Sequence, residues 1–137
     1  MSVLRADALP VRTEQDVVLA RQAVRRMTQE LGFSLVDQTK MVTAASELAR
    51  NTLIHGNGGH MQSEILHDIG RQGLRLTFQD EGPGIPDLAL AMTDGWTTGT
   101  GLGMGLTGSK RLVNEFEIES QPGQGTRVTI TRWKART

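Results

Sequence analysis

Three short segments, in a fixed order along the chain, constrain its fold more than any other feature. Glu47 and Asn51 stand four residues apart inside a helical pattern. Asp80 ends a strand pattern and is followed closely by Gly82-Pro83-Gly84. Residues 101–105 read Gly-Leu-Gly-Met-Gly and open a later helix. Together they describe a carboxylate and an amide on one helix face, a tight glycine turn and a glycine loop before a helix. This set predicts a site for a nucleotide and a metal.

The first half of the chain predicts an amphipathic helix that begins after Thr13. Thr13 is a candidate N-cap with Asp16 three residues later, and Gly32 is a candidate helix end. Between these signals, apolar residues recur at spacings of three and four, at Val17, Ala20, Val24, Met27 and Leu31. That spacing is typical of a helix with one buried face.

A second helix is predicted from Ser34 or Asp37 to about Leu53. Its expected buried face is formed by Met41, Ala45, Leu48 and Thr52. A different face carries polar neighbours at successive four-residue spacings, namely Glu47, Asn51 and His55. The polar face therefore runs along the C-terminal half of this helix.

The second half of the chain predicts strands in sequential pairs. Residues 60–69 and 74–79 flank a glycine turn and read as a hairpin, and residues 116–130 form another alternating pair. Residues 1–13 predict a short edge strand or an arm, and a helical pattern resumes near Leu106. Antiparallel strand pairs with helices on one face predict a two-layer α+β sandwich.

Composition limits the classes of protein that this chain can be. With 137 residues, we expect a single domain spanning 1–137. The formal net charge is zero, which argues against binding nucleic acid by bulk electrostatics. The chain has no Cys, and no apolar run approaches the length of a membrane span. A soluble cytoplasmic protein with no membrane partner is the expectation.

The pair Glu47 and Asn51 has two interpretations. Mg²⁺ chooses oxygen ligands and completes its shell with water and phosphate, so Asn51 can supply one oxygen. Glu47, beside the phosphates, can accept a proton from an attacking hydroxyl. The alternative is a solvated helix face, because charged residues are mostly exposed. The pair alone does not decide between them.

Asp80 and the later glycines also have two interpretations each. A buried Asp80 carboxylate can accept a hydrogen bond from an exocyclic amine such as that of adenine, whereas the alternative is a plain turn. Backbone N–H groups in residues 101–108 can hold phosphates, whereas the alternative is a flexible linker. A Rossmann interpretation is rejected because no apolar strand precedes the glycines, and the Walker A pattern is absent.

The ordered set resembles the GHKL ATPase superfamily, which includes histidine-kinase catalytic domains, Hsp90, gyrase B and MutL. Residues 47–51 are similar to its N box, residues 80–84 to its G1 box and residues 101–105 to its G2 box. The likeness spans about residues 10–134 and is greatest to the small anti-sigma-factor-type serine/threonine kinases, in particular those of stressosome signalling. It implies the Bergerat fold, with a mixed, mostly antiparallel sheet and helices on one face.

The resemblance implies a role for each matching residue and the use of ATP and Mg²⁺. Glu47 would be the general base, Asn51 the Mg²⁺ ligand and Asp80 the residue that reads adenine. Five glycines and one threonine would contact the nucleotide or leave room for it: Gly82, Gly84, Gly101, Gly103, Gly105 and Thr126. Residues 93–104 would form a mobile lid over ATP.

The resemblance also implies partners. The kinase would phosphorylate a serine or threonine on a STAS-domain protein and would then be released to activate a PP2C-type phosphatase. Alternatives are an anti-sigma factor that binds a sigma factor and phosphorylates its STAS antagonist, or a non-catalytic nucleotide-gated module. Arg21 and Arg25 lie one helical turn apart, and we expect both to be exposed and to help dock the STAS partner.

The lid departs from the pattern of some anti-sigma kinases, which carry an arginine near the phosphates. Here residues 98–101 read Thr-Gly-Thr-Gly. We therefore expect slow turnover, with cationic help from Lys110, Arg111 or Mg²⁺ alone.

Overall fold

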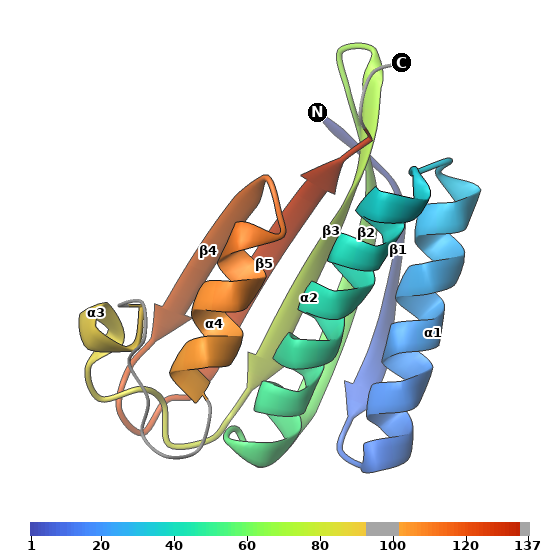
Figure 1. The fold of residues 1–137 in the computed structure, drawn as a ribbon. Helices are drawn as coiled ribbons and strands as arrows, with labels where there is room; N and C mark the ends of the chain where they lie inside the picture. The colour runs from blue at the N-terminus through green and yellow to red at the C-terminus, as the bar shows by residue number, and fades with distance from the viewer. Residues whose placement is uncertain (93–101, 135–137) are drawn as a thin grey trace.

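The computed structural model describes residues 1–92 and 102–134, and it contains a five-stranded antiparallel sheet with helices on one face (Figure 1). The strands lie in the order β1-β2-β3-β5-β4. Their bounds are β1 Ser2–Val11, β2 Gly59–Asp68, β3 Arg71–Asp80, β4 Glu115–Ser120 and β5 Thr126–Trp133. The predicted two-layer α+β sandwich is confirmed. All four strand pairings are antiparallel, so the mixed sheet that the resemblance implied is fully antiparallel among the described strands.

Helix α1 spans Glu14–Glu30 and begins where the sequence predicts. The backbone N–H of Asp16 donates to Thr13 Oγ1 at 3.0 Å, and the N–H of Arg12 donates to Asp16 Oδ2 at 2.9 Å. The first bond satisfies a donor that the first turn of a helix leaves free, and the second joins the residue before the cap to the same turn. Gly32 follows with φ +78°, a left-handed conformation that glycine adopts at low cost and that ends the helix.

Helix α2 spans Leu35–Ile54 and is capped by Ser34, whose Oγ accepts the N–H of Asp37 at 3.1 Å. Of the two predicted starts, Ser34 is therefore the cap. The predicted apolar face is buried, with Met41, Leu48 and Thr52 each at most 3% exposed. In Figure 1, α2 lies between α1 and α4 in front of the sheet. Its C-terminal end lies at the lower edge of the molecule in this view.

The second half of the chain differs from the prediction in three ways. Helix α4 spans Leu102–Arg111, so it starts four residues before Leu106. A one-turn helix, α3 at Leu88–Ala91, lies in the stretch predicted as a loop. Strand β5 lies between β3 and β4, so β4 is an edge strand that pairs with β5, an order that the sequence did not predict. Pairing between strands that are distant in sequence is a tertiary choice that local pattern does not encode.

The core lies between the helices and the sheet. Its largest buried side chains include Met41, Leu48, Leu76, Phe78 and Ile130, each at most 2% exposed. One end of this layer is the meeting point of four elements: the C-terminal ends of α2 and β3 and the N-terminal ends of α4 and β5 (Figure 1). Within the described part of the chain, no helix combines the length and apolar character that crossing a membrane requires.

Candidate functional site

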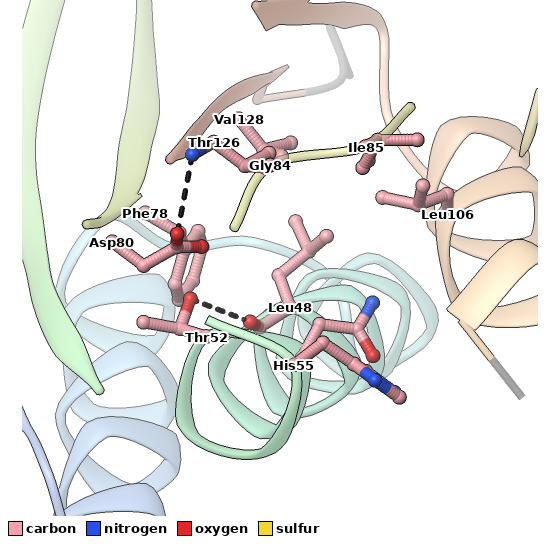
Figure 2. A pocket seen from close by; sticks show the side chains of 11 residues that line it. Leu48, Thr52, His55, Phe78, Asp80, Gly84, Ile85, Leu106, Thr126 and Val128 are labelled. Atoms are coloured by element: carbon pink, nitrogen blue, oxygen red, sulfur yellow. Dashed lines mark hydrogen bonds between the residues drawn. The ribbon is translucent and has the colours of Figure 1, made fainter. Parts of the chain in front are cut away.

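Asp80 is the last residue of β3 and is buried at the end where the four elements meet. Its Oδ1 accepts two backbone N–H groups, from Gly82 at 3.0 Å and from Thr126 at 3.2 Å. Figure 2 shows the second of these bonds. Burial raises the pKa of Asp80, and the two N–H groups oppose that shift because they stabilise the carboxylate. A side chain held in this way presents a fixed hydrogen-bond acceptor.

Glycines crowd around Asp80 because no side chain fits there. A Cβ added at Gly56 would lie 2.2 Å from Asp80 Cγ, and one at Gly125 would lie 2.2 Å from the Asp80 carbonyl oxygen. A Cβ at Gly82 would lie 2.7 Å from the Gly56 Cα. The glycine-rich loop that follows α2 therefore allows the helix end and the G1 turn to close on Asp80. Sequence analysis missed this role of Gly56 and Gly125.

A pocket opens beside Asp80 between α2, β3, β5 and α4 (Figure 2). Among the predicted site residues, Asn51, Asp80, Gly84 and Thr126 line it. The other lining residues were not predicted: Leu48, Thr52, His55, Phe78, Ile85, Leu106 and Val128. The pocket thus joins aliphatic and aromatic walls to one polar end, as small-molecule sites commonly do. The added walls come from the same apolar pattern that predicts the core, so sequence alone did not separate them from it.

Asn51 carries an unusual feature for a buried amide. Its Nδ2 is buried and has no hydrogen-bond partner within the described residues. An unsatisfied buried donor costs about 1–3 kcal/mol, so its presence beside a pocket indicates that a ligand satisfies the side chain. Glu47 lies one turn earlier on α2, is exposed and does not line the pocket. It stands nearer the solvent side of the predicted site.

The predicted glycine segment is described only in part. Gly103 and Gly105 lie in the first turns of α4, whereas Gly101 and most of the predicted lid, residues 93–101, lie outside the described residues. Leu106 follows in α4 and lines the pocket, which brings the start of α4 to the site. Lys110 and Arg111 lie in the last turn of α4 and do not line the pocket beside Asp80, so the expected cationic help at the phosphates stays a prediction.

The geometry agrees with a family comparison. The family of histidine kinase-, DNA gyrase B- and HSP90-like ATPases matches residues 36–136. The chain belongs to this family. The matched residues of this GHKL ATPase include α2, β3, α4 and β5, the elements whose residues line the pocket.

Sequence identity to known proteins indicates the branch of the GHKL family to which the chain is similar. The serine/threonine-protein kinase RsbT of Bacillus subtilis is 46% identical over 123 residues, which cover 90% of this chain and 92% of RsbT. The anti-sigma F factor of Clostridium novyi is 31% identical over 123 residues and 86% of each chain. The sequence identity to these relatives therefore confirms the expected enzyme class, a serine/threonine kinase of the partner-switching branch.

Two solved structures share the fold. The RsbU and RsbW domains of a Mycobacterium tuberculosis protein match with a TM-score of 0.64 and 22% identity, over 97% of this chain and 34% of that longer one. The SiaB–SiaC complex of Pseudomonas aeruginosa matches with a TM-score of 0.55 and 12% identity, over 96% of this chain and 90% of that one. At these identities, the matches support the fold alone.

The residues at the pocket fit a nucleotide with Mg²⁺. The described residues contain no group of three or more His, Cys, Asp or Glu side chains that would hold a metal by themselves. Mg²⁺ in nucleotide sites needs only one or two protein oxygens, because phosphates and water supply the rest. Asn51 lines the pocket, and its side-chain oxygen can fill that single role, whereas its unpartnered Nδ2 is a donor and suits an oxygen atom of a ligand. GHKL membership supports the use of ATP.

Proposed function

We propose that this chain is one kinase domain of a cytoplasmic partner switch, which uses ATP and Mg²⁺ to phosphorylate a serine or threonine of a STAS-domain protein. The observation that carries the proposal is the pocket in which Asp80 and the unpartnered Asn51 amide lie together. The kinship with RsbT supports the protein kinase, and the GHKL match supports the nucleotide.

Each residue has a chemical role in this proposal. Asp80 accepts a hydrogen bond from the exocyclic amine of adenine, while Gly82, Gly84 and Thr126 shape the base pocket. Asn51 holds Mg²⁺, which neutralises phosphate charge during transfer. Glu47 accepts the proton of the attacking hydroxyl. Gly101, Gly103 and Gly105 present backbone N–H groups toward the phosphates, beneath a lid formed by residues 93–104.

Phosphorylation of the STAS protein would weaken its complex with the kinase, and the released kinase would activate a PP2C-type phosphatase. The 46% identity to RsbT, a serine/threonine-protein kinase, supports the kinase activity on which this proposed order depends. The second candidate is an anti-sigma factor that binds a sigma factor and phosphorylates its STAS antagonist, which the 31% identity to an anti-sigma F factor favours. Co-purification of a sigma factor, rather than of a phosphatase, would select the second candidate.

The activity is tested by incubating the protein with Mg²⁺, radiolabelled ATP and the STAS proteins encoded near it. We expect Glu47→Ala and Asn51→Ala to lose phosphoryl transfer by about a hundredfold or more. Asp80→Asn should also lose ATP binding. Thr43→Ala is the matched control, because Thr43 is exposed on α2 one turn before Glu47. Undiminished transfer by the Glu47 and Asn51 variants would contradict the site. If the wild type binds ATP and transfers nothing to any STAS protein, the chain is a nucleotide-gated binding module instead.

The predicted STAS-docking residues lie on the outer side of α1. Arg25 is exposed, whereas Arg21 is half-buried, so the expectation that both are exposed is correct for Arg25 alone. We expect Arg21→Glu with Arg25→Glu to weaken STAS binding and to leave ATP affinity unchanged. Arg26→Glu, also exposed on α1, is the control for charge reversal in general. An equal effect of the Arg26 variant would place the docking surface elsewhere.

A further inference from the structure

Ser120, the last residue of β4, makes contacts with two segments that border the pocket. Its Oγ lies 2.8 Å from the backbone nitrogen of Ile85, 3.1 Å from the carbonyl oxygen of Gly125 and 2.8 Å from Thr126 Oγ1. Ile85 and Thr126 line the pocket, and Gly125 packs against the Asp80 backbone. A single hydroxyl thus joins the loop after β3 to the start of β5.

The three contacts fix the direction of every hydrogen bond. A serine hydroxyl has one hydrogen to donate and two lone pairs to accept. The Ile85 N–H can only donate, so Ser120 accepts there, and the Gly125 carbonyl can only accept, so Ser120 donates there. The remaining lone pair of Ser120 must accept the hydrogen of Thr126. No other assignment satisfies all three contacts.

The direction of these bonds determines what Thr126 offers to the pocket. Because its hydrogen is directed at Ser120, Thr126 Oγ1 has only lone pairs left for a ligand. The ionised Asp80 carboxylate, whose Oδ1 accepts two N–H groups, is also an acceptor without a hydrogen to donate. The two side chains at the polar end of the pocket therefore both demand a donor from the ligand.

We propose that Ser120 is a specificity-determining residue, which holds Thr126 as an acceptor and so makes the pocket select 6-aminopurine over 6-oxopurine nucleotides. The amino group of a 6-aminopurine supplies the hydrogens that both acceptors require. A 6-oxopurine instead places a carbonyl oxygen against lone pairs at that position. Its N1–H is the one donor left on this edge and can serve one acceptor at most, so at least one buried acceptor stays unpaired. This inference rests on the proposed function, because it assigns the base specificity of the same nucleotide site.

The test compares ATP with inosine triphosphate, whose base carries an oxygen in place of the 6-amino group and a hydrogen on N1. Dissociation constants for both nucleotides are measured by calorimetry for the wild type and for Ser120→Ala. Without Ser120, the Thr126 hydroxyl is free to rotate and donate to a 6-oxo group. We expect the preference for ATP over inosine triphosphate to fall roughly three- to tenfold, the range of one hydrogen bond. If Ser120 had a merely structural role, Ser120→Ala would weaken the binding of both nucleotides equally. The ratio of the two dissociation constants would then stay unchanged.

Two further variants keep the test decisive. Thr126→Val removes the hydroxyl itself and should lower the same ratio, even if Ser120→Ala fails to fold. Thr129→Val is the matched control, because Thr129 pairs with Thr77 at 3.5 Å between hydroxyls, and neither residue lines the pocket. Its ratio should equal that of the wild type.

The outcomes separate the inference from the proposed function. An unchanged ratio in Thr126→Val and in any folded Ser120→Ala protein, with ATP still bound by the wild type, overturns the role of Ser120 and leaves the kinase proposal standing. A wild-type protein that binds neither nucleotide overturns both.

Discussion

The two ends of helix α2 differ in how their polar groups are satisfied. At the N-terminal end, Ser34 caps the helix and the Asp37 carboxylate accepts a hydrogen bond of 2.6 Å from Arg132. Arg132 also donates to the Leu112 carbonyl at 2.7 Å, which ties the segment after α4 to the same point. At the C-terminal end, the buried Nδ2 of Asn51 has no partner among the described residues.

The N-terminal end of α2 therefore contributes to the stability of the fold, whereas the C-terminal end keeps an unsatisfied donor that a ligand can bond. Two buried side-chain nitrogens lack partners in the described chain, Asn51 Nδ2 and Arg132 Nε, and the Arg132 side chain is already bonded through its other two nitrogens. Asn51 instead lines a pocket beside Asp80. Paired groups at one end should therefore matter to folding, and unpaired groups at the other end should matter to binding.

The largest expected effect on folding is at the paired end. Arg132→Met leaves Asp37, whose side chain is only 12% exposed, without its cation, and should lower the free energy of unfolding by about 3 kcal/mol. Urea unfolding measures the loss, and ATP affinity well below the melting temperature should stay near that of the wild type. Arg75→Met is the control, because it breaks a comparable pair with Glu64 outside both helices. A large loss of ATP affinity for Arg132→Met would contradict the division between the two ends.

A glycine at the pocket end gives the next effect. Gly125 has φ +80°, and an added Cβ would lie 2.2 Å from the Asp80 carbonyl oxygen, so Gly125→Ala should cost about 2 kcal/mol or more and weaken ATP binding. Gly123 has φ +79° with nothing within 4 Å of an added Cβ. Gly123→Ala should therefore cost only about 1 kcal/mol, for the left-handed backbone alone. Equal thermal shifts for the two variants would show that contact with Asp80 is unimportant.

The pH dependence of folding tests the buried carboxylate. Because burial raises the pKa of Asp80, the folded state binds its proton more readily than the unfolded state, and the free energy of unfolding falls as pH rises through that window. Asp80→Asn keeps an acceptor for the two N–H groups and removes the charge. It should be at least as stable as the wild type at neutral pH, and this advantage should shrink as pH falls toward about 4. Unfolding curves of both proteins across that pH range measure the difference in stability. If the stability advantage of Asp80→Asn grew as pH fell, the raised pKa of Asp80 would be contradicted.

The smallest expected effect concerns the unpartnered amide. Asn51→Leu removes a buried polar group that the protein does not satisfy, so its stability should lie within about 0.5 kcal/mol of the wild type or above it. Thr52→Val, one residue later, removes a hydroxyl that donates to the Leu48 carbonyl at 2.9 Å and should cost about 1 kcal/mol. Thermal unfolding compares the two. A loss of several kcal/mol for Asn51→Leu would mean that Asn51 is structural.

Local chemistry explains why much of the fold was predictable. The Thr13 and Ser34 caps, the apolar face of α2 and the alternation in the hairpin act over a few residues, and each was found in the predicted place. The position of β5 between β3 and β4 was not predicted, because it depends on how distant segments pack.

The candidate site was predictable to a similar extent. Asn51, Asp80, Gly84 and Thr126 were named from short motifs and a family resemblance, and all four line one pocket. Gly56 and Ser120 were missed because each acts through a contact that is distant in sequence, Gly56 with Asp80 across 24 residues and Ser120 with Ile85 across 35 residues, and no local pattern signals such contacts. Sequence thus indicates which residues have the right chemistry, whereas the fold decides which surroundings they receive.

The central claim is that Asp80 at the end of β3 and Asn51 at the end of α2 form an ATP site. It is tested most directly by measuring the dissociation constant of Mg-ATP for the wild type and for Asp80→Asn, together with the melting temperature of each. The account predicts that the wild type binds ATP and that Asp80→Asn binds it at least about tenfold more weakly without a lower melting temperature. Equal ATP affinity in the two proteins would contradict it.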